Sequence, residues 1–477
     1  MNNSQVPLGL HDFSIPFHFI GICGTAMGAV AAMLKRQGYK VTGSDEQIYP
    51  PMSTFLENEG ISVQKGYRPE NLPGDPSSII IVGNTIKRGN PEIEAVLNQK
   101  RFYISLPEAL KTYFLRGKRN VVITGTHGKT TTTSITAWLL ESAQLHPSFL
   151  IGGIPENFGL GCRHVQSDFW ILEGDEYDTA FFDKRSKFIH YLPEIVVINN
   201  IEFDHADIYE NLDAIKLSFR RLMNIIPQNG LVIYNADDTH ACEVASTALA
   251  KKIGVSMRKN SGVQNISDIQ LHPQYSAFTY LNQRFTLPMA GEINIRNAAM
   301  AITVAQHLGI PLHQIAIALR EFKGVRRRQQ HRGEVNGIHV IDDFGHHPTA
   351  IRETIRAIRQ QYPRSRIWAI FEPRSNTTRR AVFQNILPDA LATADAVIVA
   401  QVAALQQIPE NERLNPERVV KDIQAKGVPA YYEPHVDAII QRVLSTAQVN
   451  DVLLILSNGG FDQIHDKLLH ALAEKKS

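Results

Sequence analysis

Short runs of β-branched and aromatic residues alternate with helix-like stretches over the first hundred residues. The strand-like runs cover residues 17–22, 40–43 and 78–82, and the helix-like runs cover 29–37 and 54–59. Strands that alternate with helices in this way are typical of βαβ units, in which the strands run parallel. The pattern predicts a Rossmann-like sheet at the N-terminus.

The same alternation returns further along the chain. Residues 169–173 and 195–200 are apolar runs that end in polar residues, as buried parallel strands do. Beyond them, the predicted elements are helices at 295–308 and 349–361 and strands at 338–341, 366–371, 396–400 and 452–456. The last of these elements predict a second doubly wound sheet, so we expect an α/β fold throughout.

The length of the chain predicts several domains. With 477 residues, 43% of them hydrophobic, the chain can form about three domains with their own cores. The polar stretch 116–120 reads as a linker, and an arginine-rich stretch at 324–328 precedes the last sheet. We therefore expect domains at 1–117, 118–325 and 326–477.

Composition excludes some partners. The net charge is +2 and the pI is about 8.3, so no broad basic field indicates nucleic acid or a membrane surface. Cys23, Cys162 and Cys242 are too widely spaced for a disulfide framework or a metal ladder. With no secretory pattern at the start and no run of transmembrane length, we expect a cytoplasmic protein.

A phosphate-binding loop is the most informative motif. A β-branched strand leads into the residues Gly125, Thr126, His127, Gly128, Lys129, Thr130 and Thr131. The two glycines permit a tight turn before a helix N-terminus, Lys129 can reach phosphates and Thr130 can hold magnesium. Only two residues separate Gly125 from Gly128, whereas the general P-loop has four. A Gly/Thr-rich turn is the alternative, but the strand–turn–helix context favours a nucleoside triphosphate.

A second glycine-containing turn follows the first predicted strand. Its residues are Gly21, Cys23, Gly24, Thr25, Ala26 and Met27, and Ser44 and Asp45 close the next strand. The spacing resembles a dinucleotide-binding fingerprint, but Cys23 occupies the place of its second glycine. NAD and a UDP-type diphosphate stay open as ligands, as does a purely structural role in helix packing.

Polar residues at strand ends are candidate ligands, because ligands of open α/β sheets bind beyond the carboxyl ends of the strands. Glu173 and the turn from Glu202 to His205 are magnesium candidates, with His205 as an extra ligand or a proton acceptor. The alternative for Glu173 is a surface acid in a charged loop.

Two further strand ends lie in the third segment. They are the stretches 342–348 and 372–378, and both are rich in charged and polar residues. Pro348 suits the first turn of a helix, with His347 near its cap. The nearby arginines at 326–328 could pair with phosphate or carboxylate, or could form a solvated face.

Together these motifs resemble the Mur ligases, the ATP-dependent amide ligases of bacterial peptidoglycan metabolism. The resemblance rests on Gly125–Thr132, Gly21–Gly24, Asn294, Asn297 and the stretch 342–349, and it covers nearly the whole chain. It implies an N-terminal UDP-sugar domain, a central P-loop ATPase domain and a Rossmann-like C-terminal domain that receives the amine. It also implies ATP and Mg²⁺ as cofactors and an acyl-phosphate intermediate.

The resemblance assigns roles to named residues. Lys129, His205, Arg327 and His347 would be catalytic; Thr130, Glu173 and His205 would hold magnesium; Asn294, Asn297, Arg327 and Asp343 would contact the nucleotide with the phosphate loop. Several family members carry a carbamylated lysine between the metals. Here the predicted helix 212–224 places Phe219 at that position and Lys216 out of register, so we do not predict the modification.

The stretches 49–54, 175–187, 372–377 and 457–461 resemble the family branch that acts in peptidoglycan recycling. That branch implies UDP-N-acetylmuramate and the murein tripeptide L-alanyl-γ-D-glutamyl-meso-diaminopimelate as partners. The tripeptide's carboxylates would bind Arg374, Ser375, Asn376 and Thr377, because charge-assisted hydrogen bonds are strong. The alternatives are ligation of free L-alanine and, from another class, an NAD(P)-dependent oxidoreductase.

Overall fold

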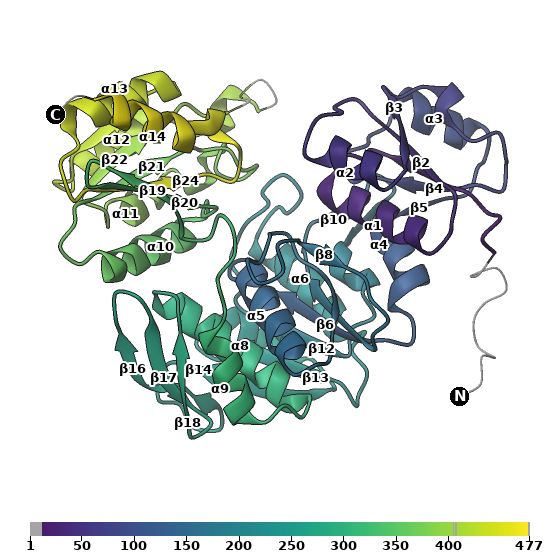
Figure 1. Ribbon diagram of the computed structural model, residues 1–477, viewed down its shortest axis with the longest axis horizontal. Coiled ribbons are helices and arrows are strands. Elements are labelled where there is room, and N and C mark those ends of the chain that lie inside the picture. The colour runs from purple at the N-terminus through teal and green to yellow at the C-terminus, as the bar shows by residue number, and fades with distance from the viewer. Residues whose placement is uncertain (1–11, 404, 406–407, 476–477) are drawn as a thin grey trace.

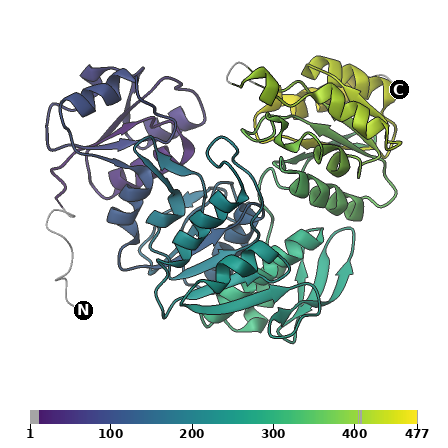
Figure 2. The same ribbon diagram turned by 180° about the vertical axis from the view of Figure 1, so that it is seen from behind.

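The chain forms three sheet-centred units that follow one another in sequence (Figure 1). The computed structural model describes residues 12–403, 405 and 408–475. The central unit lies between the N-terminal and C-terminal units, and the view from behind shows the same arrangement (Figure 2). The predicted α/β class and the predicted order of sheets are confirmed.

The N-terminal unit is a five-stranded parallel sheet in the order β3-β2-β1-β4-β5. Its strands are β1 (Phe17–Ile20), β2 (Val41–Asp45), β3 (Ser62–Lys65), β4 (Ile79–Val82) and β5 (Tyr103–Ser105). Its helices are α1 (Thr25–Arg36), α2 (Met52–Asn58), α3 (Pro91–Asn98) and α4 (Leu106–Leu110). The prediction started the first helix four residues late, because the small residues after Gly24 hid the first turn of α1.

The central unit contains an eight-stranded sheet in the order β15-β14-β13-β12-β6-β9-β7-β8. Its strands are β6 (Arg119–Thr124), β7 (Ser148–Leu150), β8 (Cys162–Arg163), β9 (Phe169–Glu173), β12 (Ile195–Ile198), β13 (Leu231–Asn235), β14 (Lys251–Ser256) and β15 (Gln264–Asn265). Its helices are α5 (Lys129–Ser142), α6 (Leu212–Met223), α7 (Thr239–Ser246), α8 (Glu292–His307) and α9 (Leu312–Arg320). Since β9, β6 and β12 are parallel neighbours, their carboxyl ends meet at one edge.

Two smaller sheets extend the central unit. The hairpin of β10 (Asp178–Ala180) and β11 (Asp183–Ser186) follows β9, and a meander of β16 (Ser267–Leu271), β17 (Ser276–Tyr280) and β18 (Gln283–Leu287) precedes α8. The meander lies beside the C-terminal unit, where the Nε2 of Gln360 donates to the carbonyl of His272 at 2.7 Å.

The C-terminal unit is a six-stranded sheet in the order β19-β20-β24-β21-β22-β23, with β19 antiparallel to its neighbour. Its strands are β19 (Gln330–Val335), β20 (Ile338–Asp343), β21 (Ile367–Phe371), β22 (Ala396–Val399), β23 (Ala430–Tyr432) and β24 (Val452–Leu456). Its helices are α10 (Pro348–Gln361), α11 (Leu387–Leu391), α12 (Pro416–Gln424), α13 (Val436–Thr446) and α14 (Ile464–Glu474).

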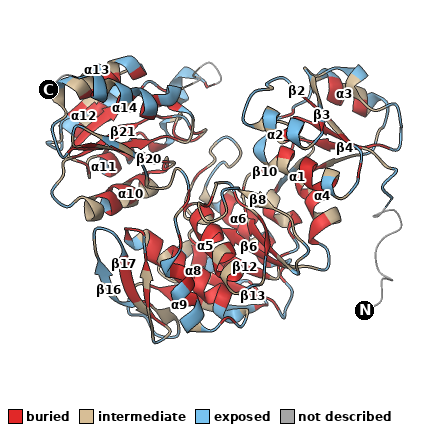
Figure 3. Ribbon diagram, in the orientation of Figure 1, coloured by how far each residue is buried: buried red, intermediate tan, exposed pale blue. Residues whose placement is uncertain are grey.

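Apolar clusters fill both faces of the central and C-terminal sheets, as the buried strands and inner helix faces show (Figure 3). This explains why the central strands read as continuous apolar runs rather than alternating ones. Among the described residues, no helix combines the length and the apolar character needed to span a bilayer.

Candidate active site

The phosphate-binding loop has the backbone that its glycines predict. Gly125 and Gly128 have φ values of +124° and +77°. A Cβ at Gly125 would lie 2.9 Å from the backbone of Asn200, and one at Gly128 would lie 2.4 Å from Asn297 Oδ1. Only glycine fits either place, and Gly128 caps the N-terminus of α5, where anions bind favourably.

Lys129 is held inside this loop by an acidic partner. Its Nζ donates to the carbonyl of Gly125 at 2.7 Å and to Glu176 Oε2 at 2.9 Å. Burial would lower the pKa of Lys129, but the charge of Glu176 and neighbouring carboxylates raises it above its ordinary value. The ammonium group is therefore charged, and Glu176 occupies the side on which a phosphate would bind.

Thr130 and Glu173 form the pair predicted for magnesium. The Oγ1 of Thr130 donates to Glu173 Oε1 at 2.9 Å, while Glu173 Oε2 accepts from the Gly152 amide at 2.7 Å. A hydroxyl and a carboxylate beside a phosphate-binding loop are the oxygen donors that Mg²⁺ prefers. The residues present fit that ion.

His205, the third predicted magnesium ligand, has a different partner. Its Nε2 donates to Glu176 Oε1 at 3.2 Å. Although burial acts in the opposite direction, the hydrogen bond and charge of Glu176 raise the pKa of His205 to about 9. In this structure His205 is therefore an ion-pair partner of Glu176, and together with Asp175 and Glu176 it forms a group whose ligand atoms lie close enough to hold a metal ion.

The two predicted adenine-reading residues lie on one face of α8, and both are buried. The amide of Asn294 donates to the carbonyl of Ala290 at 2.7 Å, and Asn297 lies against Gly128. Both side chains line the cavity that contains the phosphate-binding loop. Their placement brings α8 next to the nucleotide loop, as the prediction requires.

Arg327, which was predicted to reach the γ-phosphate, lines the cavity, but in this structure its guanidinium is bound within its own unit. Its Nη2 donates to the carbonyls of Ser457 and Gly459 at 2.7 and 2.8 Å, and its Nε lies 3.3 Å from Asp342. Arg327 has a φ of +59°, and this turn directs Arg327 back into its own unit. The next residue, Arg328, donates to Thr130 Oγ1 at 3.2 Å. Arg328 is therefore the arginine that reaches the magnesium pair.

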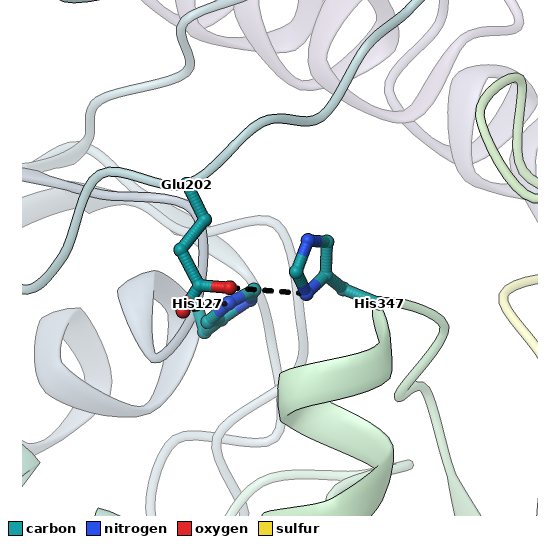
Figure 4. A group of neighbouring side chains, drawn as sticks. All are labelled: His127, Glu202 and His347. Atoms are coloured by element: carbon teal, nitrogen blue, oxygen red, sulfur yellow. Dashed lines mark ion pairs between the residues drawn. The ribbon is translucent and has the colours of Figure 1, made fainter. Parts of the chain in front are cut away.

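His347 and Asp343 lie at the start of the C-terminal unit. His347 is the N-cap of α10 and Pro348 its first residue, as predicted. Its ring lies 4.5 Å from the ring of His127, beside Glu202 (Figure 4). Burial, with His127 adjacent, lowers the pKa of His347 to about 3, so the ring is neutral.

Asp343 is buried and accepts the amides of Gln329 and Gly345 at 2.8 and 2.7 Å.

The N-terminal turn lies between β1 and α1. Gly24 caps α1 without a side-chain hydrogen bond, and Asp45 Oδ2 accepts the Cys23 amide at 2.9 Å. The cavity is lined here by Gly21, Gly24, Thr25, Ala26, Met27 and Asp45. The lining of this cavity includes neither Cys23 nor Ser44, and the fully buried hydroxyl of Ser44 donates to Glu92.

One cavity of about 1600 Å³ connects these features. It extends from the N-terminal turn past the phosphate-binding loop to Arg328, Asp343 and His347. Tyr67 also lines this cavity. It belongs to no motif in the sequence, so sequence reasoning did not predict it as a site residue. Two groups that bind at the two loops could therefore meet inside the same enclosure.

The predicted peptide-binding residues lie mostly in an interface instead. Thr377 Oγ1 donates to Asp204 Oδ1 at 2.6 Å, and Asn376 Nδ2 donates to Asp207 Oδ2 at 2.7 Å. Ser375 bonds with Thr378 at 2.8 Å. These contacts tie the loop after β21 to the central unit. Arg374, whose side chain is 48% exposed, is the member of this group with a guanidinium open to solvent.

Lys216 lies apart from the magnesium pair. Its Nζ pairs with Glu243 and Asp213, while Phe219 packs against Phe188 in the apolar core.

Models of the Mur ligases match all three units. The Mur ligase family catalytic domain matches residues 16–117, the Mur ligase middle domain matches 123–305, and the Mur ligase glutamate ligase domain matches 327–459.

Similar proteins cover nearly the whole chain. A UDP-N-acetylmuramate–L-alanyl-γ-D-glutamyl-meso-2,6-diaminoheptandioate ligase of Escherichia coli is 40% identical over 96% of this chain and 98% of its own. The ligase of the same name from Haemophilus influenzae is 42% identical over 96% and 99%. The crystal structure of a murein peptide ligase from Psychrobacter arcticus, 33% identical, covers 97% of this chain and 100% of its own with a TM-score of 0.71. The chain belongs to the Mur ligase family.

Proposed function

We propose that the chain is an ATP-dependent amide ligase that joins UDP-N-acetylmuramate to L-alanyl-γ-D-glutamyl-meso-diaminopimelate. The observation that supports this most is the single cavity that joins a diphosphate-type turn, a triphosphate-binding loop and the first residues of the C-terminal unit. An oxidoreductase would use only the first of these. The names of the two relatives at 40% and 42% identity support the tripeptide as the amine.

In the proposed reaction, the muramoyl carboxylate attacks the γ-phosphorus of ATP, and ADP leaves. The amine of the tripeptide then attacks the acyl carbon of the acyl phosphate, and phosphate leaves with formation of the amide. Both steps bring like charges together, so catalysis depends mainly on charge neutralisation and positioning.

The chain supplies that neutralisation from three directions. Lys129 would exchange Glu176 for the β- and γ-phosphates, and the amides at the start of α5 would bind the same oxygens. Thr130 and Glu173 would hold Mg²⁺, which would neutralise charge on the phosphates. Arg328 would contribute a guanidinium from the C-terminal unit.

The remaining assignments belong to the same proposal. Asn294 and Asn297 would contact adenine, with Asp343 and His347 near the nucleotide. The turn at Gly21–Met27 would bind the UDP diphosphate at the open N-terminus of α1. Arg374 would pair with a carboxylate of the tripeptide. We propose domains at 1–117, 118–325 and 326–477, and a cytoplasmic location, where ATP and nucleotide sugars are found.

ADP release tests this function. The assay contains ATP, Mg²⁺ and UDP-N-acetylmuramate with the tripeptide, and parallel reactions omit each component in turn. We expect ADP release and a product with the summed mass of sugar nucleotide and tripeptide less water, only when all four are present. ADP release independent of the amine, or a change in nicotinamide absorbance with added NAD(P)H, would contradict the proposal.

A further inference from the structure

Two histidines and a glutamate from three separate segments meet where the central unit contacts the C-terminal unit (Figure 4). His127 comes from the phosphate-binding loop, Glu202 from the loop after β12 and His347 from the N-cap of α10. One possible ligand atom from each side chain lies within 4.8 Å of the other two. The proposed ligase chemistry assigns no metal ion to these three side chains.

The spacing within the cluster suits a metal ion. His127 Nε2 lies 3.2 Å from Glu202 Oε1, and His347 Nδ1 lies 3.5 Å from Glu202 Oε2. Ligand atoms about 2.0–2.1 Å from a tetrahedral zinc ion lie about 3.3 Å from one another. The carboxylate therefore lies at ligand-to-ligand distance from both rings.

His127 also has an unused lone pair or proton. The residue is 8% exposed, and within the described part of the chain no group makes a hydrogen bond with its Nε2. Glu202 Oε1 lies 3.2 Å from this nitrogen. Buried polar atoms of this kind are rarely left without a partner.

The two other members are held in place by hydrogen bonds, one of which a bound ion would replace. The Nε2 of His347 donates to the carbonyl of Phe203 at 3.2 Å, so the lone pair of the ring is on Nδ1, where an ion would displace the Thr349 amide. The Nδ1 of His347 accepts the Thr349 amide at 3.2 Å, at the long end of the range for such bonds. Glu202 Oε2 accepts the Thr349 hydroxyl at 2.7 Å, which fixes the carboxylate between the rings. The His127 backbone amide donates to Asn200 Oδ1 at 2.8 Å.

We propose that His127, Glu202 and His347 form a binding site for a transition-metal ion of the Zn²⁺, Co²⁺ and Ni²⁺ class, separate from the magnesium pair. Two imidazoles and one carboxylate favour these ions over Mg²⁺, which prefers oxygen ligands alone. The remaining coordination position is open to water. A bound ion would connect the phosphate-binding loop to the N-cap of α10 and hold the two units together.

Titration of the full chain with Co²⁺, without nucleotide, tests the site through the visible absorption of the bound ion. We expect one saturable Co²⁺ site that Zn²⁺ displaces. His127→Asn, Glu202→Gln and His347→Asn should each weaken Co²⁺ binding by at least about tenfold. His346→Asn, at the neighbouring histidine that pairs with Asp204, and Glu173→Gln, in the magnesium pair, are the matched controls and should bind Co²⁺ as the wild type does.

Loss of Co²⁺ binding in Glu173→Gln, or unchanged binding in both His127→Asn and His347→Asn, would overturn the proposal. Anomalous scattering from wild-type crystals grown with Co²⁺ decides the matter if a variant fails to fold. A peak between His127 and His347 supports the site, and a peak found elsewhere, or none, overturns it.

Discussion

At the scale of single residues, Lys129 and Glu176 form a buried ion pair in the place where phosphates should bind. Removing one partner of such a pair costs about 3–5 kcal/mol of stability, because the other charge stays buried. Removing both costs far less. Comparing the replacement of Lys129 alone with the replacement of both residues therefore separates the catalytic role of Lys129 from its effect on stability.

Lys129→Met should lower kcat for ADP release by at least about 100-fold, since it removes a charge that stabilises the transferring phosphoryl group. It should also lower the free energy of unfolding, measured in urea. In Lys129→Met/Glu176→Gln, stability should recover while activity stays lost. Recovery of activity in the double variant would show that Lys129 serves only to neutralise Glu176.

The pKa of His205 should fall toward 6.5 in Glu176→Gln, because Glu176 holds the ring protonated. A raised pKa means that the stabilisation from this pair is fully present below about pH 6.5 and is lost as the pH rises through about 9. NMR titration of the imidazole measures the shift. Glu210→Gln, at an exposed carboxylate of the same loop, is the control, and an equal shift there would contradict the assignment.

Three consecutive arginines should respond differently to replacement by alanine. Arg328→Ala should lower kcat on the order of 100-fold with little change in the KM for the sugar nucleotide, because Arg328 reaches the magnesium pair. Arg327→Ala should mainly destabilise the loop after β24. Arg326→Ala, which loses an exposed pair with Glu156, should change neither quantity much. Greater loss of turnover in Arg327→Ala would favour the original assignment.

Sequence reasoning proposed Thr130 from the phosphate-binding loop and Glu173 from the rule that ligands bind where neighbouring parallel strands end. The arginine run by itself does not distinguish Arg326, Arg327 and Arg328, and the family resemblance selected Arg327. Which of the three reaches the magnesium pair depends on the left-handed backbone of Arg327, which no periodicity in the sequence indicates. Sequence reasoning also did not single out Glu176, because several residues close to it in the sequence are acidic as well.

At the scale of elements, the strands were easier to predict than the contacts of the hairpin β10–β11. The continuous apolar runs of β9 and β12 marked them as buried strands. The hairpin is short and charged, yet its tip residues Phe181 and Phe182 pack on the N-terminal unit, where Phe182 meets Tyr103 with ring centroids 4.8 Å apart. Only the three-dimensional arrangement reveals this contact.

The hairpin tip should therefore position the N-terminal unit. Phe182→Ala should raise the KM for UDP-N-acetylmuramate several-fold while the KM for ATP stays unchanged. The reason is that the turn at Gly21–Met27, which would bind the UDP diphosphate, would no longer be held in position relative to the phosphate-binding loop. Initial rates at varied sugar nucleotide measure the effect. Leu249→Ala, at an 85% exposed side chain of the central unit, is the control. Equal KM changes for both substrates would indicate general destabilisation instead.

At the scale of the whole molecule, the C-terminal unit contacts the central unit through Thr377 with Asp204, Thr349 with Glu202, and Gln360 with His272. Sequence predicted the loop around Thr377 as a peptide site, because its polar residues are equally suited to bind a ligand or a neighbouring unit. Arg374, with a side chain that is 48% exposed, is a cation of this loop that an amine with extra carboxylates could pair with.

The identity of the amine is the central claim, and a direct competition measures it. Equimolar tripeptide and L-alanine are supplied together with ATP, Mg²⁺ and UDP-N-acetylmuramate, and mass spectrometry gives the ratio of the two products. We predict that the tripeptide product dominates by at least tenfold, since charge-assisted hydrogen bonds to its carboxylates contribute about 1.5–3 kcal/mol each. A mixture in which the alanine product dominates would contradict the account.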